Sequence, residues 1–344
     1  MRAIFSLAAL LALSSLGLAA PSPKKSKANG AASSQQQQTP QQQAAAIPQG
    51  ISQATDGSTI LDTNATVNGL NLRFKISGPE SAFTTASGVA GSKARARAAG
   101  TLGLNVLLHG DGGQSFFDFP NQAVQNGLMG VVVLAPSEQL LWGQHAGPPA
   151  GLSRVDGVAD AQAVADLVST VLPQLVAFDP AQLFFTGVSG GSLTLSGFFI
   201  PAQLAQFAAP GTGVLLMCGA LEPQVDVVNA SAFAGTSRIH FQSTQQELAL
   251  LQPAIPAAIA AYEAEARAAG LSDAQIGLLQ TVDNTPDGGH CEFDEEGFSS
   301  GIQLIADNFA SIMQGGDGTV EGINAPTVLT SVVGNENLQF SGAS

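Results

Sequence analysis

A run of apolar residues that ends at a serine between glycines is the feature that most limits how this chain can fold. Residues 183–188, Leu-Phe-Phe-Thr-Gly-Val, have the composition of a buried strand, and Ser189 follows directly. Gly187, Gly190 and Gly191 surround the serine, and a helix-length segment comes next. Very small residues are required where a strand reverses sharply into a helix. We therefore expect a strained turn that holds the Ser189 hydroxyl above the edge of a sheet.

A second serine between glycines occurs at residues 297–301, Gly-Phe-Ser-Ser-Gly. The segment before it, residues 292–296, is Glu-Phe-Asp-Glu-Glu, which is too acidic to form a buried parallel strand. We expect Ser299 to lie on a loop or on one face of a helix.

The N-terminus has the layout of a secretory signal peptide at residues 1–19, with Arg2, an apolar run and small residues at its end. Residues 20–50 are rich in glutamine and lack apolar periodicity, which predicts a disordered arm. Residues 51–314 have the length of one α/β domain, and the packing of the glycine-rich tail at 315–344 is not predicted. The sequence thus predicts a secreted, extracellular protein, and no later stretch is apolar enough to span a bilayer.

Charge and composition exclude several partners. The net charge of −14 opposes binding to nucleic acid or to an anionic membrane. No cysteine and histidine cluster has metal-ligand spacing, and neither phosphate-binding glycine pattern is present, so we expect neither a metal nor a cofactor.

The two cysteines, Cys218 and Cys291, are expected to form one disulfide if the chain is exported, and two buried free thiols are the alternative. Asn64 and Asn229 each begin an Asn-x-Ser/Thr sequence and would be glycosylated in a eukaryotic host.

Strand-like and helix-length segments alternate along the chain, which predicts an α/β fold with a mostly parallel sheet and helices on both faces. Residues 59–63 and 70–76 are expected to form an antiparallel hairpin at the sheet edge, because Asn68-Gly69 favours a tight turn. The expected parallel strands are 104–108, 131–134, 183–185, 214–217, 239–242 and 277–282, and the expected helices are 120–126, 157–175, 192–207, 246–269 and 299–313.

The strand, serine and glycines resemble the nucleophile elbow of the α/β-hydrolases. The resemblance covers roughly residues 104–290, and it includes 132–136 with Trp142 as well as Phe178-Asp179-Pro180. These segments are similar to those of secreted polyhydroxybutyrate depolymerases and feruloyl esterases. Gly190 stands where such relatives usually have alanine, and Ser192 where they have glycine. The resemblance implies the α/β-hydrolase fold and a serine esterase.

In this family the histidine follows the nucleophile along the chain, which leaves out His109 and His145 as the catalytic base. His240 lies inside a strand-like run, where its ring would be fixed in the sheet. His290 lies on a loop after the last expected strand, and the resemblance assigns it the role of base. A disulfide beside it would hold this loop at the sheet edge where ligands bind in open α/β sheets.

The third member of the triad must accept a hydrogen bond from the imidazole. Glu247 follows the strand before the last, where related enzymes usually carry the acid, although an acidic residue also suits the first turn of the helix expected there. Asp226 is the second choice, while Asp283 and Asp287 lie close to His290 in sequence and could hold its loop instead.

The segment 106–113, Val-Leu-Leu-His-Gly-Asp-Gly-Gly, resembles the strand and His-Gly element that supplies an oxyanion donor. The resemblance implies that the N–H of Asp111 or Gly112 acts together with that of Gly190. Because a carboxylate would oppose an oxyanion, the Asp111 side chain is expected to turn away.

Phe116 and Trp142 are expected to border the substrate pocket, since they follow the oxyanion segment and the next strand. Phe198 and Phe199, behind the elbow, are expected to be core residues.

These features predict a secreted serine hydrolase that acts on a neutral or apolar carboxylic ester, small or polymeric, without a cofactor. Ser189 would attack the carbonyl, His290 would transfer the proton and Glu247 would orient His290. A peptidase or amidase with the same triad and a non-catalytic binding protein of the same fold are the alternatives.

Overall fold

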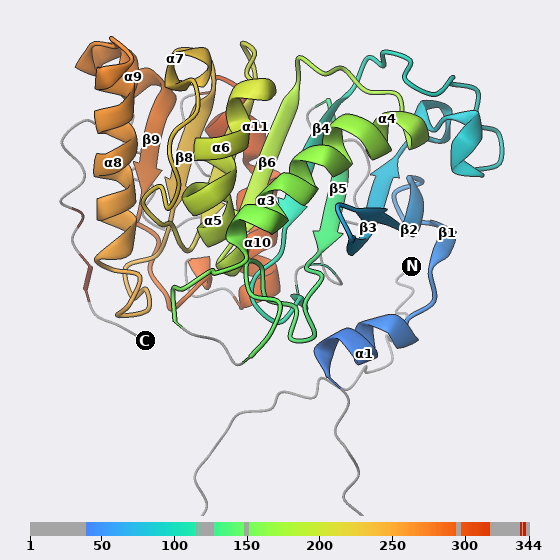
Figure 1. The fold of residues 1–344 in the computed structure, drawn as a ribbon, viewed down its shortest axis with the longest axis horizontal. Helices are drawn as coiled ribbons and strands as arrows, with labels where there is room; N and C mark the ends of the chain where they lie inside the picture. Colours follow the sequence, from blue (N-terminus) through green and yellow to red (C-terminus); the bar gives the residue numbers. More distant parts are fainter. Residues whose placement is uncertain are drawn as a thin grey trace, which may run out of the picture. The chain divides into compact units, whose positions relative to one another are not determined.

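The alternating segments build one mixed β-sheet with helices packed on it (Figure 1). The computed structural model describes residues 39–114, 116, 127–147, 151–293, 297–316, 338 and 340–341. The signal-peptide segment, the arm up to residue 38, the helix expected at 120–126 and most of the tail lie outside the described residues.

The described sheet has nine strands in the order β1-β2-β3-β5-β4-β6-β7-β8-β9. Neighbouring strands in the part β5-β4-β6-β7-β8-β9 pair in parallel. Neighbouring strands in the part β1-β2-β3-β5 pair antiparallel. This arrangement is the predicted α/β-hydrolase fold. The strands are β1 Gly50–Gln53, β2 Thr59–Val67, β3 Leu70–Gly78, β4 Gly103–Leu108, β5 Leu128–Leu134, β6 Leu183–Val188, β7 Gly213–Met217, β8 Arg238–Gln242 and β9 Gln280–Asp283.

The predicted hairpin is confirmed, but its predicted place at the edge is wrong. Asn68 (φ 51°) and Gly69 (φ 82°) form the turn between β2 and β3, both with the positive φ that a tight hairpin turn requires. Strand β1 pairs with the outer side of β2, so β1 is the edge of the described sheet.

Residues 39–50, part of the segment expected to be a disordered arm, are described in the structure and include a helix. Thr39 and Gln42 form a capping box that starts helix α1 (Pro40–Ala46). Buried Arg73 pairs with Asp62 and donates to the carbonyl oxygen of Ala44 at 2.6 Å. The end of the glutamine-rich segment therefore packs on the hairpin, because a buried guanidinium needs these acceptors.

Helices cover both faces of the sheet, as predicted (Figure 1). One face carries α3 to α6 and α8, and α10 and α11 lie behind the sheet. Their bounds are α3 Gly157–Asp166, η3 Leu167–Val171, α4 Leu172–Leu175, α5 Gly190–Thr194, η4 Leu195–Phe199, α6 Ile200–Gln203, η5 Leu204–Gln206, α7 Ala230–Phe233, α8 Ala254–Ala268, α9 Asp273–Leu279, α10 Phe298–Asp307 and α11 Phe309–Met313, with short turns η1 Glu80–Ala82 and η2 Thr85–Ser87.

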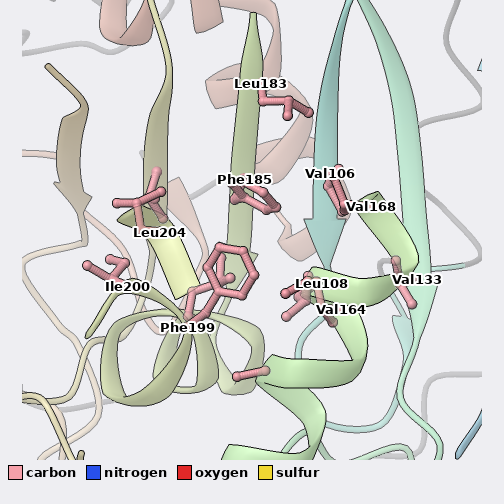
Figure 2. Packing of buried hydrophobic residues seen from close by; sticks show 14 of the residues in the cluster. Val106, Leu108, Val133, Val164, Val168, Leu183, Phe185, Phe199, Ile200 and Leu204 are labelled. Carbon is pink, nitrogen blue, oxygen red and sulfur yellow. The ribbon is translucent and has the colours of Figure 1, made fainter. Parts of the chain in front are cut away.

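Strand β6, which leads to Ser189, is buried on both faces. The Phe185 ring packs on Phe199, with centroids 4.4 Å apart, and on the opposite face Phe184 meets Phe309 at 5.4 Å. Figure 2 shows the side chains that surround Phe185 on its face: Val106 and Leu108 of β4, Val133 of β5, Val164, Val168, Ile200 and Leu204. Packing on both sides fixes the end of β6, from which the serine projects.

Two predicted elements near the C-terminus are wrong in their bounds. The helix expected at 246–269 begins only at Ala254, because residues 245 and 246 donate backbone hydrogen bonds to the loop after β9. The strand expected at 277–282 is helical up to Leu279, since Ser272 and Gln275 form a capping box that starts α9.

His240 of β8 is fully buried. Its Nδ1 lies 2.8 Å from Thr281 Oγ1 and its Nε2 lies 3.2 Å from Gln242 Oε1. Burial lowers the pKa of His240 from 6.5 to about 4, so the ring is neutral in the folded protein at pH 7.

We expect acid to destabilise the fold through this histidine. His240 binds the proton near pH 6.5 in the unfolded chain and only near pH 4 in the folded protein, so its contribution to stability falls as the pH drops through this window and does not change further below it. The loss attributable to His240 is about 3 kcal/mol. Urea unfolding at pH 7 and pH 4.5 measures it. The His240→Gln variant should show a clearly smaller loss than the wild type, and equal losses in the two proteins would contradict the assignment.

Candidate active site

Ser189 lies between β6 and α5 at φ 49° and ψ −111°, a conformation that residues with side chains rarely adopt. Its N–H donates to the carbonyl oxygen of Met217 in β7 at 2.9 Å. A Cβ at Gly187 would lie 2.5 Å from the Cα of Ser192, and one at Gly191 would lie 2.1 Å from a backbone oxygen of β4. The predicted sharp turn is present, and only glycine fits on either side of it.

The structure brings Ser189 together with the predicted histidine and the first-choice acid. Ser189 Oγ lies 2.8 Å from His290 Nε2, and His290 Nδ1 is hydrogen-bonded to Glu247 Oε1. The Glu247 side chain has no solvent exposure, and its Oε1 also accepts from the N–H of Leu248 at 2.8 Å. With the proton on Nδ1 facing the carboxylate, Nε2 is left to accept from the serine hydroxyl.

The alternative acids lie elsewhere. Asp226 is exposed in the segment between β7 and α7. Asp283 Oδ1 accepts from the N–H of Thr285 at 2.8 Å, and Asp287 Oδ1 accepts from the amide of Gln246 at 2.9 Å. The latter two aspartates therefore shape the loop that carries His290.

Two loops hold the base and the acid in register. We call residues 243–249 the acid loop and residues 284–290 the histidine loop. The hydrogen bonds that join them include Gln245 N–H to Pro286 O at 2.9 Å, Gln246 N–H to Gly288 O at 3.1 Å, and Thr244 Oγ1 to Gly289 O at 2.9 Å. The two bonds donated by the backbone N–H groups of Gln245 and Gln246 join backbone to backbone, so they align Glu247 with His290 independently of either side chain.

The predicted disulfide is confirmed. Cys218, directly after β7, is bonded to Cys291, beside His290, with 5.3 Å between the Cα atoms. The bridge attaches the histidine loop to the end of a strand that neighbours β6. The two sulfurs and His290 lie within 4.8 Å of one another, but sulfurs in a disulfide are not the thiolates that a metal ion needs.

His109 and His145 are engaged in other contacts. His109 is fully buried, and burial lowers its pKa to about 4. Its Nδ1 lies 2.6 Å from the carbonyl oxygen of Gly110, and its Nε2 accepts from the N–H of Ala135 at 2.9 Å, so the ring ties the segment after β4 to the end of β5. His145 lies 2.6 Å from Asp160, which raises the pKa of His145.

The two predicted alternatives for one oxyanion donor, the N–H groups of Asp111 and Gly112, differ in their hydrogen bonds. The Gly112 N–H donates to the carbonyl oxygen of Leu140 at 3.1 Å, so it is already used within the loops. In the described part of the chain, the N–H groups of Asp111 and Gly190 have no hydrogen-bond partner. These two donors remain for a developing oxyanion.

The Asp111 side chain is held in an ion pair beside the elbow. Its Oδ2 lies 2.7 Å from Nη2 of Arg154, and its Oδ1 lies against Gly190, where a Cβ would come within 1.9 Å of it. Buried Arg154 holds the carboxylate in this place. Sequence reasoning missed Arg154, although it is the only lysine or arginine between Arg97 and Arg238.

Phe116 and Trp142, predicted to border the substrate pocket, have no solvent exposure in the described part of the chain. The Phe116 ring lies beneath Lys75, whose Nζ is 4.5 Å from the ring centroid, and Trp142 packs on His109 at 5.5 Å between centroids. Both aromatic rings contribute packing area to the core instead.

No protein-family model and no curated protein matches the chain. Solved structures do match. An ester hydrolase from the metagenome of Lake Arreo is 15% identical over 74% of this chain and 82% of its own, with a TM-score of 0.44. An esterase from Pseudomonas putida is 14% identical (77% and 83%, TM-score 0.41), and an acylaminoacyl peptidase from Pyrococcus horikoshii is 10% identical (74% and 42%, TM-score 0.43). Similarity at this level does not identify a substrate or a reaction.

Removal of the disulfide should destabilise the protein and loosen the histidine loop. The bond closes a segment of 73 residues, for which loop-closure entropy predicts a loss of about 4 kcal/mol in unfolding free energy. Urea unfolding of a Cys218→Ser, Cys291→Ser variant measures the loss, and hydrogen exchange should quicken first in residues 284–290. Two titratable thiols in the denatured, unreduced wild type would contradict the assignment.

Proposed function

We propose that this chain is a serine hydrolase that cleaves carboxylic esters through an acyl-enzyme. The observation that carries the proposal is the Ser189 Oγ to His290 Nε2 distance of 2.8 Å at a strained turn, with buried Glu247 on the other ring nitrogen. A serine hydroxyl becomes nucleophilic when a base oriented in this way takes its proton.

In the proposed reaction, Ser189 Oγ attacks the ester carbonyl while its proton passes to His290 Nε2. The N–H groups of Gly190 and Asp111 donate to the oxyanion. The intermediate collapses as His290 returns the proton to the leaving alcohol, which departs and leaves an acyl group on the serine. Water then attacks, with His290 again as base, and the carboxylic acid is released. Glu247 stabilises the imidazolium that forms in each step.

The chemistry favours a neutral or apolar ester. The net charge of −14 repels anionic substrates at long range, and the reaction above uses only groups of the chain itself, without a metal or cofactor. A peptidase or amidase would use the same groups, so matched ester and amide substrates discriminate between the two activities.

We place the protein outside the cell. A disulfide persists in oxidising compartments, and the N-terminus has the pattern of a signal peptide. Asn64 and Asn229 are both exposed, as glycosylation requires. Among the described residues, no helix has the length and apolar character needed to cross a bilayer.

Replacing the nucleophile should abolish hydrolysis and leave the fold intact. Ser189→Ala removes the attacking oxygen and no core packing, so we expect turnover of a neutral ester to fall by at least about four orders of magnitude. Ser299→Ala is the matched control, since Ser299 lies in helix α10 and does not follow a strand. Initial rates of both variants give the test, and loss of activity in the control alone would overturn the assignment of the nucleophile.

Replacing the triad acid, Glu247, should lower kcat. In Glu247→Gln the amide no longer stabilises the imidazolium, so we expect kcat to fall by about three to four orders of magnitude. Asp226→Asn, which changes an exposed carboxylate, should keep wild-type kinetics. A damaging Asp226→Asn change beside a harmless Glu247→Gln change would show that the acid follows β7 instead.

A further inference from the structure

We propose that Asp111 determines substrate specificity: its carboxylate accepts a hydrogen bond from a hydroxyl or ammonium group on the carbon next to the scissile carbonyl. This inference rests on the proposed ester hydrolysis and names the substrate class, esters of 2-hydroxy or 2-amino acids.

The first observation is where the carboxylate lies. Asp111 Oδ1 occupies the space in which a Cβ of residue 190 would stand, because a Cβ built there falls 1.9 Å from it. Residue 190 directly follows the nucleophile. The acceptor oxygen thus lies beside the residue whose N–H is proposed to donate to the oxyanion. An alanine at 190, usual in the similar hydrolases, would collide with this oxygen, so the two unusual residues Asp111 and Gly190 fit each other.

The second observation is what fixes the carboxylate. Asp111 Oδ2 lies 2.7 Å from Nη2 of Arg154, whose side chain is 1% exposed, whereas the Asp111 side chain is 32% exposed. One carboxylate oxygen is thus held by a buried cation, and the described residues provide no hydrogen bond to Oδ1. The pair has no net charge, which explains how a carboxylate is tolerated next to the place where an oxyanion forms.

The ion pair with Arg154 lets the Asp111 side chain serve as an acceptor. Burial raises its pKa above the ordinary value, and the nearby Arg154 and His290 charges limit the rise. A carboxylate held by a guanidinium accepts hydrogen bonds and donates none.

The substrate class follows from the spacing of groups within one residue. Asp111 offers two groups a short distance apart: a backbone N–H donor and, four bonds from that nitrogen, a carboxylate oxygen acceptor. An ester of a 2-hydroxy or 2-amino acid offers the complement: a carbonyl oxygen that accepts and, three bonds away, a hydroxyl or ammonium that donates. One residue can therefore bind both groups at once. Esters with a carboxylate at the same position would meet Asp111 with like charge and be rejected.

The alternative is that Asp111 serves only as a counter-ion for Arg154. That role predicts a change in stability on replacement but the same ranking of substrates. The ratio of kcat/KM between two esters that differ by one group separates these readings, because the overall activity cancels in the ratio.

The experiment compares ethyl lactate with ethyl propionate, with ethyl alaninate and monoethyl malonate as the charged pair, by titration of the released acid. We expect the wild type to prefer ethyl lactate over ethyl propionate by about 10- to 100-fold, as for a hydrogen bond to a charged group. In Asp111→Asn the side-chain oxygen should face Arg154 and the amide N–H₂ should face the substrate, so the preference should vanish or reverse. Asp226→Asn should keep the wild-type ratio.

Gly190→Ala gives an independent variant, since its Cβ displaces the carboxylate and should lower the same ratio. A wild-type ratio near one, or an unchanged ratio in both Asp111→Asn and Gly190→Ala, would overturn the inference while leaving ester hydrolysis in place. A wild type that cleaves none of the four esters would instead contradict the proposed function, and the inference with it.

Discussion

A carboxylate without solvent exposure, Glu247, is the constraint on which the rest of the site depends. A buried charge is stable only with a partner, and His290 supplies it. Several features of the chain hold His290 beside Glu247. The acid and histidine loops are joined by backbone hydrogen bonds, the disulfide attaches the histidine loop to β7, and Met217 of β7 also accepts from the N–H of Ser189. The same strand end therefore supports both the base and the strained nucleophile.

The chemistry of the site was more predictable from the sequence than its surroundings. Ser189 could be predicted as the nucleophile because only glycines fit around a sharp turn. His290 could be predicted as the base from its position along the chain and from the disulfide beside it. The acid loop was predicted as helix because its composition favours one; hydrogen bonds to a segment about 40 residues away override that local preference, and periodicity cannot detect them. The burial of Phe116 and Trp142 was missed for a related reason, since an aromatic residue in a loop has the same sequence signature whether it faces a pocket or the core.

Asp111 and Gly190 both differ from the residues that are usual in the similar hydrolases, and the two differences are related through Arg154. A carboxylate in an oxyanion segment and a glycine in place of alanine each look unfavourable or neutral alone. In the structure the carboxylate fills the space that the missing methyl group leaves, and a buried arginine 43 positions along the chain neutralises it. The turn at residue 190 and the segment around residue 111 do not by themselves require Gly190 or Asp111. The fit between these two residues is the basis for the proposed role of Asp111 in substrate choice.

We propose that Ser189 is a nucleophile activated by His290 and Glu247. Mass spectrometry of the protein after treatment with a fluorophosphonate tests it most directly, because this reagent bonds covalently to activated serines. We expect one adduct per chain, located by peptide mapping on Ser189 and absent from the Ser189→Ala variant. An adduct on another residue, or a folded wild type that never reacts, would contradict it.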